Sequence, residues 1–162
     1  MRWTYNHANA PAAFADAPHA VVERIQRAFD RWTSQCGIRD AYAGATDVAP
    51  NNDATDSANP PAADGISVVG WDTLAPSLGA WAYAWYVADG DRRTIVEADV
   101  TLSIDNVRTL DDVERLMIHE WGHALGLDHS DVEAAVMAGP PATHYNGLAS
   151  LQPDDLRGCR CA

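Results

Sequence analysis

The apolar and polar positions of the chain repeat with two periods, one of which is helical. Between residues 18 and 35 the apolar side chains recur at helical spacing, which predicts a helix with one face in the core. These positions are Val21, Val22, Ile25, Ala28, Phe29 and Trp32. Pro18 suits an early position in this helix, and Gly37 is expected to end it. Arg24 and Arg31 lie off the apolar face and are predicted to be solvated.

The shorter period predicts strands. Large or apolar side chains alternate with small or polar ones, wholly or in part, over residues 2–6, 38–43, 66–71, 79–87 and 94–104. Residues 6–17 are predicted to form a polar connection, and residues 44–64 form a long loop rich in Asn, Asp, Ala and Pro. The chain is therefore predicted to mix strands with helices.

A second helix is predicted from its amino-terminal cap. Thr109, with Asp112 three residues later, matches an N-cap pair, and Asp111 adds negative charge to the first turn. Leu116 continues the apolar face of this helix. The helix is expected to end at Gly126, because glycine readily adopts the backbone of a carboxyl-terminal cap.

Composition narrows the class of protein. The formal net charge is −12, which disfavours nucleic acid as a partner. No apolar run reaches the roughly 20 residues that a membrane span needs. All 11 basic residues are arginine, and the absence of lysine excludes Schiff-base and Ser–Lys catalysis.

The three cysteines leave two interpretations open. A disulfide from Cys36 to Cys159 or to Cys161 would tie the end of the first long helix to the carboxyl terminus, as suits a secreted protein. Such a bond would leave one thiol unpaired, so three free thiols are the equal alternative.

The stretch from His119 to His129, HEWGHALGLDH, carries the candidate chemistry. Two histidines four residues apart on a helix lie about 40° apart, so the imidazoles of His119 and His123 can reach one metal ion. A continued helix would turn His129 about 240° away from His123. Gly126 permits the backbone to break, so that His129 returns as a third ligand.

Glu120 is predicted to be the general base. Three neutral ligands leave a fourth position for water, which is typical of catalytic zinc, and zinc lowers the pKa of that water to about 7. Glu120 would take the proton of the water and return it to the leaving amine, while zinc stabilises the oxyanion. The residues alone therefore predict a zinc hydrolase.

The pattern HExxHxxGxxH resembles the signature of the metzincin zinc endopeptidases. Ser130 and the continuation to Met137 are similar to the matrixins, the matrix-metalloprotease family. The resemblance implies that Met137 is the Met-turn residue beneath the zinc. It also implies that the Asp pair, Asp154 and Asp155, supports this turn and the mature amino terminus.

The resemblance further implies a fold of the α/β (α+β) class. The expected catalytic domain spans residues 1–162 and has a twisted mixed sheet of about five strands, a backing helix and an active-site helix. An amino-terminal subdomain is expected over about residues 1–126, and a small irregular carboxyl-terminal subdomain, ending in a helix, over about 127–162.

The same resemblance implies where substrate binds. Ala80, Trp81 and Ala82 are similar to the edge strand that pairs with an extended peptide. Trp81 stands where vertebrate members have a histidine for a structural zinc, so we expect one zinc and no second.

The specificity pocket and the second kind of metal ion are less well defined by the sequence. Pro141 and Tyr145 are the nearest match to the wall of the pocket, and Arg115 either shortens the pocket or is solvated. Oxygen-bearing side chains in loop 44–64, among them Asp47 and Asn51, would suit calcium. Their spacing does not match an EF-hand, and a solvated loop is the simpler interpretation.

The expected function is that of a secreted, monomeric zinc endopeptidase that hydrolyses internal peptide bonds of a protein or peptide substrate. Neither nucleic acid nor a membrane is expected as a partner. Two alternatives stay open: a zinc hydrolase of a small amide, and a non-catalytic binding module on the same fold. The intact Glu120 disfavours the second.

Overall fold

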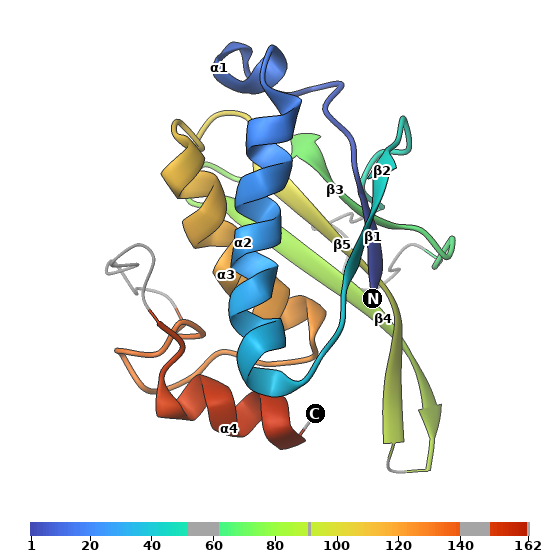
Figure 1. Ribbon diagram of the computed structural model, residues 1–162, viewed down its shortest axis with the longest axis vertical. Helices are drawn as coiled ribbons and strands as arrows, with labels where there is room; N and C mark the ends of the chain where they lie inside the picture. The colour runs from blue at the N-terminus through green and yellow to red at the C-terminus, as the bar shows by residue number, and fades with distance from the viewer. Residues whose placement is uncertain (52–61, 91, 140–149, 162) are drawn as a thin grey trace.

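The computed structural model describes residues 1–51, 62–90, 92–139 and 150–161 (Figure 1). Five strands form one sheet: β1 (Arg2–Tyr5), β2 (Ala41–Ala45), β3 (Ser67–Asp72), β4 (Ala80–Asp89) and β5 (Arg92–Ser103). Their order is β2-β1-β3-β5-β4. All neighbours are parallel except β4, which runs antiparallel to β5 at one edge. This is the predicted twisted mixed sheet of five strands.

The helices are α1 (Ala12–Ala15), α2 (Pro18–Cys36), α3 (Leu110–Ala124) and α4 (Pro153–Cys161). Figure 1 shows α2 and α3 side by side against the sheet, with α4 across one end of the pair. None of the helices in the described part of the chain has the length and apolarity of a membrane span.

The helix α2 forms where its apolar period predicted it. Val21, Ile25, Phe29 and Trp32 are fully buried against the sheet and α3. Gly37 ends the helix in the left-handed conformation, with φ 69°. The Nε1 of Trp32 donates to the carbonyl of Ile118 at 2.8 Å, which fixes α3 against α2.

Two arginines of α2 correct an expectation from the sequence. Arg24 and Arg31 were predicted to be solvated, but they pair with the buried carboxylate of Glu114 on α3, at 2.9 and 3.0 Å. A buried carboxylate requires such partners, because an unpaired buried charge is strongly disfavoured. The polar face of α2 therefore helps to position α3.

The connection at residues 6–17 contains the unpredicted short helix α1. Phe14 of α1 is buried and stacks on Trp71, with ring centroids 5.1 Å apart. The second strand also begins later than expected, at Ala41.

A disulfide joins Cys36, at the end of α2, to Cys159 on α4. This is one of the two pairings that the sequence left open. The bond holds α4 to the end of α2 across a sequence separation of 123 residues.

Candidate active site

The motif that carries the chemistry begins on α3 and leaves it by a regular helix end. The cap of α3 is a capping box, in which Thr109 and Asp112 each accept a hydrogen bond from the backbone N–H of the other. At the far end, Gly126 takes φ 89°. Its N–H donates to the carbonyl of His123, and the N–H of Leu127 donates to that of Gly122, which together form a Schellman motif.

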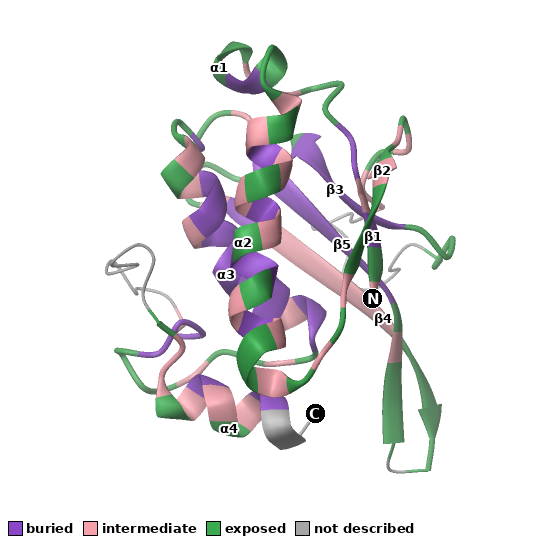
Figure 2. Ribbon diagram, viewed as in Figure 1, coloured by how far each residue is buried: buried purple, intermediate pink, exposed green. Residues whose placement is uncertain are grey.

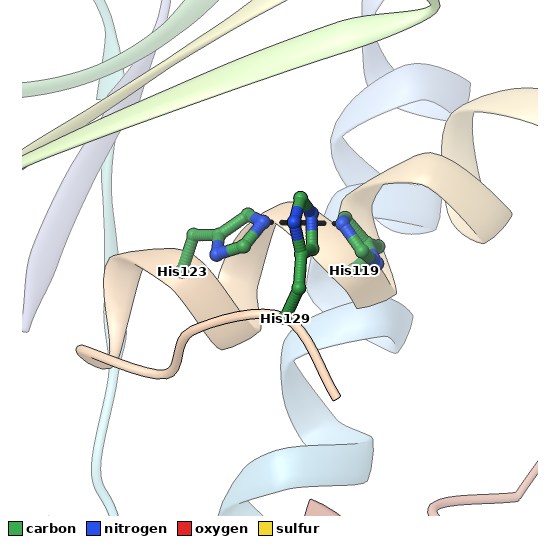
Figure 3. A group of neighbouring side chains, drawn as sticks. All are labelled: His119, His123 and His129. Carbon is green, nitrogen blue, oxygen red and sulfur yellow. Dashed lines mark hydrogen bonds between the residues drawn. The ribbon is translucent and has the colours of Figure 1, made fainter. Parts of the chain in front are cut away.

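Because the helix ends at Ala124 and the chain reverses at Gly126, His129 comes back toward the helix. Figure 3 shows the rings of His119, His123 and His129 facing one another. Their candidate ligand atoms all lie within 4.8 Å of one another. The predicted function of Gly126, breaking the helix between the second and third histidines, thus matches the backbone that the structure shows.

The hydrogen bonds of two of these rings select the tautomer that a metal requires. Nδ1 of His119 lies 2.8 Å from the carbonyl of Val136, and Nδ1 of His123 lies 2.8 Å from that of Leu127. Each Nδ1 must be the donor, because a carbonyl only accepts, and each Nε2 then keeps its lone pair. The two Nε2 atoms lie 3.1 Å apart, close to the roughly 3.4 Å expected of two ligands on one tetrahedral zinc ion.

The protonation states also fit a zinc ion. Burial lowers the pKa of His119 to about 4, and burial likewise lowers the pKa of His123. Both imidazoles are therefore neutral ligands at neutral pH. Three imidazoles that face one another are the donor set of a catalytic zinc site.

Glu120 lies beside this cluster and faces the edge strand. Its carboxylate accepts a hydrogen bond from the backbone N–H of Ala82, and burial raises its pKa to about 8. A carboxyl group with a pKa close to neutral pH can both take and return a proton.

Met137 lies directly beneath α3. A Cβ atom added to Gly122 would fall 2.1 Å from the Sδ of Met137, so only glycine permits this close approach. The sequence interpretation had not singled out Gly122. A glycine in a helix interior disfavours the helix by about 1 kcal/mol relative to alanine, and this was the available signal.

The helix α4 holds the backbone around Met137. The carboxylate of Asp155 accepts hydrogen bonds from the N–H groups of Val136 and Met137, both at 3.0 Å. Asp154 accepts from the hydroxyl of Ser130. The amino group of Met1 donates to the carbonyl of Arg39 at 2.6 Å.

A groove of about 1460 Å³ runs past the histidines, lined on one side by Ala80, Trp81 and Ala82 of β4. Leu116, which the sequence interpretation did not place in the site, also lines it. Arg115 is absent from the described residues that line the groove, and its Nη2 donates to Asp112 at 3.1 Å.

Two other predicted features cannot be placed. Pro141 and Tyr145, named for the pocket wall, lie outside the described residues. So do residues 52–61 of the loop named for calcium. Asn51, at the start of that undescribed part, donates its backbone N–H to the carboxylate of Asp99.

Comparison with known proteins agrees with this geometry. The family model described as Matrixin matches residues 2–161. Metalloendoproteinase 1 of Glycine max is 30% identical over 98% of this chain and 52% of its own length. Metalloendoproteinase 2-MMP of Arabidopsis thaliana is 27% identical over 97% of this chain and 41% of its own length. The chain thus spans about half the length of these relatives, or less.

Proposed function

The chain belongs to the matrixin family, and from this premise we propose that it is a zinc-dependent endopeptidase that hydrolyses internal peptide bonds of proteins. The observation that carries the proposal is the convergence of His119, His123 and His129, with Glu120 beside them, in one groove that the edge strand β4 also lines. We propose one catalytic domain over the whole chain, with the subdomain boundary near Gly126.

Each residue of the site has a proposed role. His119, His123 and His129 would hold one zinc ion, which supplies a Lewis acid that lowers the pKa of water and polarises a carbonyl group. The carbonyls of Val136 and Leu127 orient two of the rings. Met137 supplies the apolar floor beneath them.

Glu120 would act as the general base. Its carboxylate takes the proton of the attacking water and returns it to the nitrogen of the leaving amine, so that one group serves both halves of the reaction. Its burial favours this exchange, because a desolvated carboxylate holds a proton more tightly than a solvated one.

The edge strand β4 would bind the substrate backbone. It is the outermost strand of the sheet, and its residues Ala80 to Ala82 face the groove, so an extended peptide can add to the sheet there. The role of Arg115 in shortening the specificity pocket stays a prediction. Secretion is also part of the proposal, and the disulfide supports it, since such bonds persist in oxidising compartments.

The test combines metal content with proteolysis. We expect about one zinc per chain by elemental analysis, and digestion of casein that a chelator abolishes and zinc restores. Glu120→Gln should keep the zinc and lose at least a hundredfold in kcat/KM, because the base is gone while the ligands remain.

Three outcomes would contradict the proposal. Cleavage of small amides without cleavage of casein would indicate a different zinc hydrolase. Zinc binding without any hydrolysis would indicate a binding module. A zinc content near two would show that Trp81 does not mark the loss of a second zinc site.

A further inference from the structure

The hairpin of β4 and β5 extends beyond the rest of the sheet. β3 pairs with β5 only over residues 69–72 and 100–103, whereas β4 pairs with β5 from Ala80 opposite Leu102 to Asp89 opposite Arg92. Residues 85–90 and 92–96, here named the hairpin arm, therefore form a two-stranded ribbon. Figure 1 shows the arm projecting past the end of the molecule that carries α4.

The arm gathers exposed apolar side chains. Among the described residues six large hydrophobic side chains are exposed, and the three most exposed are Val87 at 59%, Tyr86 at 53% and Val96 at 50%. All three lie on the arm, and Figure 2 shows both of its strands as exposed. An isolated two-stranded ribbon is only marginally stable, and an exposed apolar edge invites pairing with another chain. Such a surface is expected where a partner binds.

The arm is continuous with the active-site groove. Tyr86, Arg93 and Ile95 line the same groove as His119. Ile95 also packs at the helix end, because a Cβ added to Gly126 would lie 3.4 Å from its Cδ1. The register between β4 and β5 shifts between Trp85 and Tyr86, and such a bulge bends and twists a ribbon where the arm begins.

We propose that the hairpin arm binds an extended, apolar segment of the protein substrate, on the amino-terminal side of the cleaved bond; this proposal rests on the endopeptidase function proposed above. The N–H of Ala82 donates to Glu120, so Ala82 is the reference point on β4 for the position of the cleaved bond. Tyr86 lies four residues further along the strand, about 14 Å away, and Asp89 seven residues further, about 24 Å away.

The orientation follows from strand pairing. Antiparallel pairs are somewhat more stable per residue than parallel pairs, so a substrate strand is expected to run opposite to β4. Residues that precede the cleaved bond by about four to seven positions then lie on the arm.

The chemistry of the arm selects apolar side chains. The guanidinium of Arg93 lies 4.9 Å from the centre of the Tyr86 ring, which partly satisfies its charge. Asp89 stands directly opposite Arg92 in the ribbon. The described part of the arm thus carries one acidic and two basic side chains, of which Arg92 faces Asp89 and Arg93 lies over an aromatic ring. Tyr86, Val87 and Val96 supply the exposed apolar surface.

The test uses peptides of increasing length with a fixed cleavage site. Three residues before the cleaved bond make the short peptide, and the long peptide adds four more, either leucines or serines. We expect the leucine extension to raise kcat/KM roughly tenfold or more in the wild-type protein, and the serine extension to raise it much less. The double variant Tyr86→Ser/Val87→Ser should lose the gain and still cleave the short peptide at the wild-type rate.

The matched control is Tyr42→Ser. Tyr42 is an exposed tyrosine on β2, the strand at the opposite edge of the sheet, and its substitution should leave the gain intact. Circular dichroism and the melting temperature of each variant check that the fold is kept.

Several results would overturn the proposal. They are equal rates for short and long peptides, a gain that survives in the double variant, or a gain that appears only when the carboxyl-terminal side is lengthened. Sedimentation that shows a dimer of wild-type chains but a monomer of the double variant would instead assign the arm to a second copy. If the wild-type protein cleaved none of the peptides, this result would contradict the proposed endopeptidase function and would not test the proposed role of the arm.

Discussion

At the scale of single residues, Asp99 is a buried ionisable residue that lies outside the histidine motif. This residue of β5 is fully buried and accepts a hydrogen bond from the backbone N–H of Val68 at 2.8 Å and another from that of Asn51. Burial raises its pKa to about 6, although the two hydrogen bonds act in the opposite direction. The nearby carboxylates of Glu97 and Asp64 raise it further.

The raised pKa of Asp99 predicts a pH dependence of stability. The pKa rises from 3.8 to about 6 on folding, so the folded protein binds this proton more tightly than the unfolded chain does. The contribution is present below pH 3.8 and is lost as the pH rises through about 6. Relative to Asp99→Asn, the wild type should lose up to about 3 kcal/mol in its free energy of unfolding across this range.

Urea unfolding of the zinc-free proteins between about pH 4 and pH 7 measures this difference. The exposed Asp105→Asn controls for the removal of one charge. The change of this free-energy difference with pH is diagnostic. A difference that is the same at every pH would report only the altered hydrogen bonds. A difference that does not change with pH would show that Asp99 titrates alike in both states.

The sequence predicted the residues of the motif more completely than the residues that support them. His119, His123 and Gly126 follow from helix geometry alone, because their relation is local. Gly122 and Asp99 act on partners distant in the sequence, Met137 and Asn51, and no local period reports such a contact. Arg115 illustrates the same limit, since an arginine on a helix can face the groove or another side chain.

At the scale of elements, α4 acts as a clamp on the segment that carries Met137. Asp155 is 2% exposed, and its carboxylate accepts three backbone hydrogen bonds, from Val136, Met137 and Gln152. The carbonyl of Val136 is the group that orients His119. Asp155 of α4 therefore acts on His119 through a single peptide unit. Its carboxylate holds the N–H of that unit, at Met137, and the carbonyl of the same unit, at Val136, accepts from His119.

Asp155→Asn should weaken both the fold and the candidate site. An asparagine has one acceptor oxygen, and its amide nitrogen would face a backbone donor, so the free energy of unfolding should fall by about 1–3 kcal/mol. Displacement of the carbonyl that orients His119 should reduce zinc affinity by about 10- to 100-fold. Thermal unfolding and competition with a chromophoric chelator measure the two effects.

Asp154→Asn is the neighbouring control on α4. Asp154 accepts from the side chains of Ser130 and Arg157 and does not touch the backbone at Met137, so the loss of zinc affinity should be smaller. Equal zinc affinity in wild type and Asp155→Asn would show that the clamp does not position the ligand.

The elements themselves were predictable in proportion to their length and regularity. The 19 residues of α2 show a full apolar face, and its stop at Gly37 agrees with the sequence. The helix α1 has four residues, which is too short to display a period, and it was missed. The pairing of Arg24 and Arg31 with Glu114 was also missed, because periodicity separates apolar from polar faces without naming partners.

At the scale of the whole molecule, the disulfide joins the first long helix to the last. Removing it with Cys36→Ser/Cys159→Ser should lower the free energy of unfolding by about 2–4 kcal/mol, because the unfolded chain regains the freedom of a long loop. Differential scanning calorimetry with and without a reductant measures the effect. Reductant should lower the melting temperature of the wild type toward that of the double variant.

Cys161→Ser, which leaves both bonded cysteines in place, is the matched control. It should keep the wild-type response to the reductant. A double variant as stable as the wild type would show that packing alone holds α4 in place.

The overall architecture was predictable only through the family resemblance. Strand periods indicate that strands exist, but the order β2-β1-β3-β5-β4 depends on parallel pairings between strands that are distant in sequence. The disulfide partner was likewise open between Cys159 and Cys161, because the two cysteines lie two residues apart and spacing alone does not choose between them.

The link between α2 and α4 also orders events during biosynthesis. The ribosome releases Cys36 and the histidine motif well before Cys159, so a growing chain carries the ligands while the clamp of Asp155 is still missing. The floor under the histidines is complete only after the last helix has been made and folded back. A nascent chain that has not yet formed α4 therefore lacks the hydrogen bonds that hold Val136 and Met137 beside the histidines.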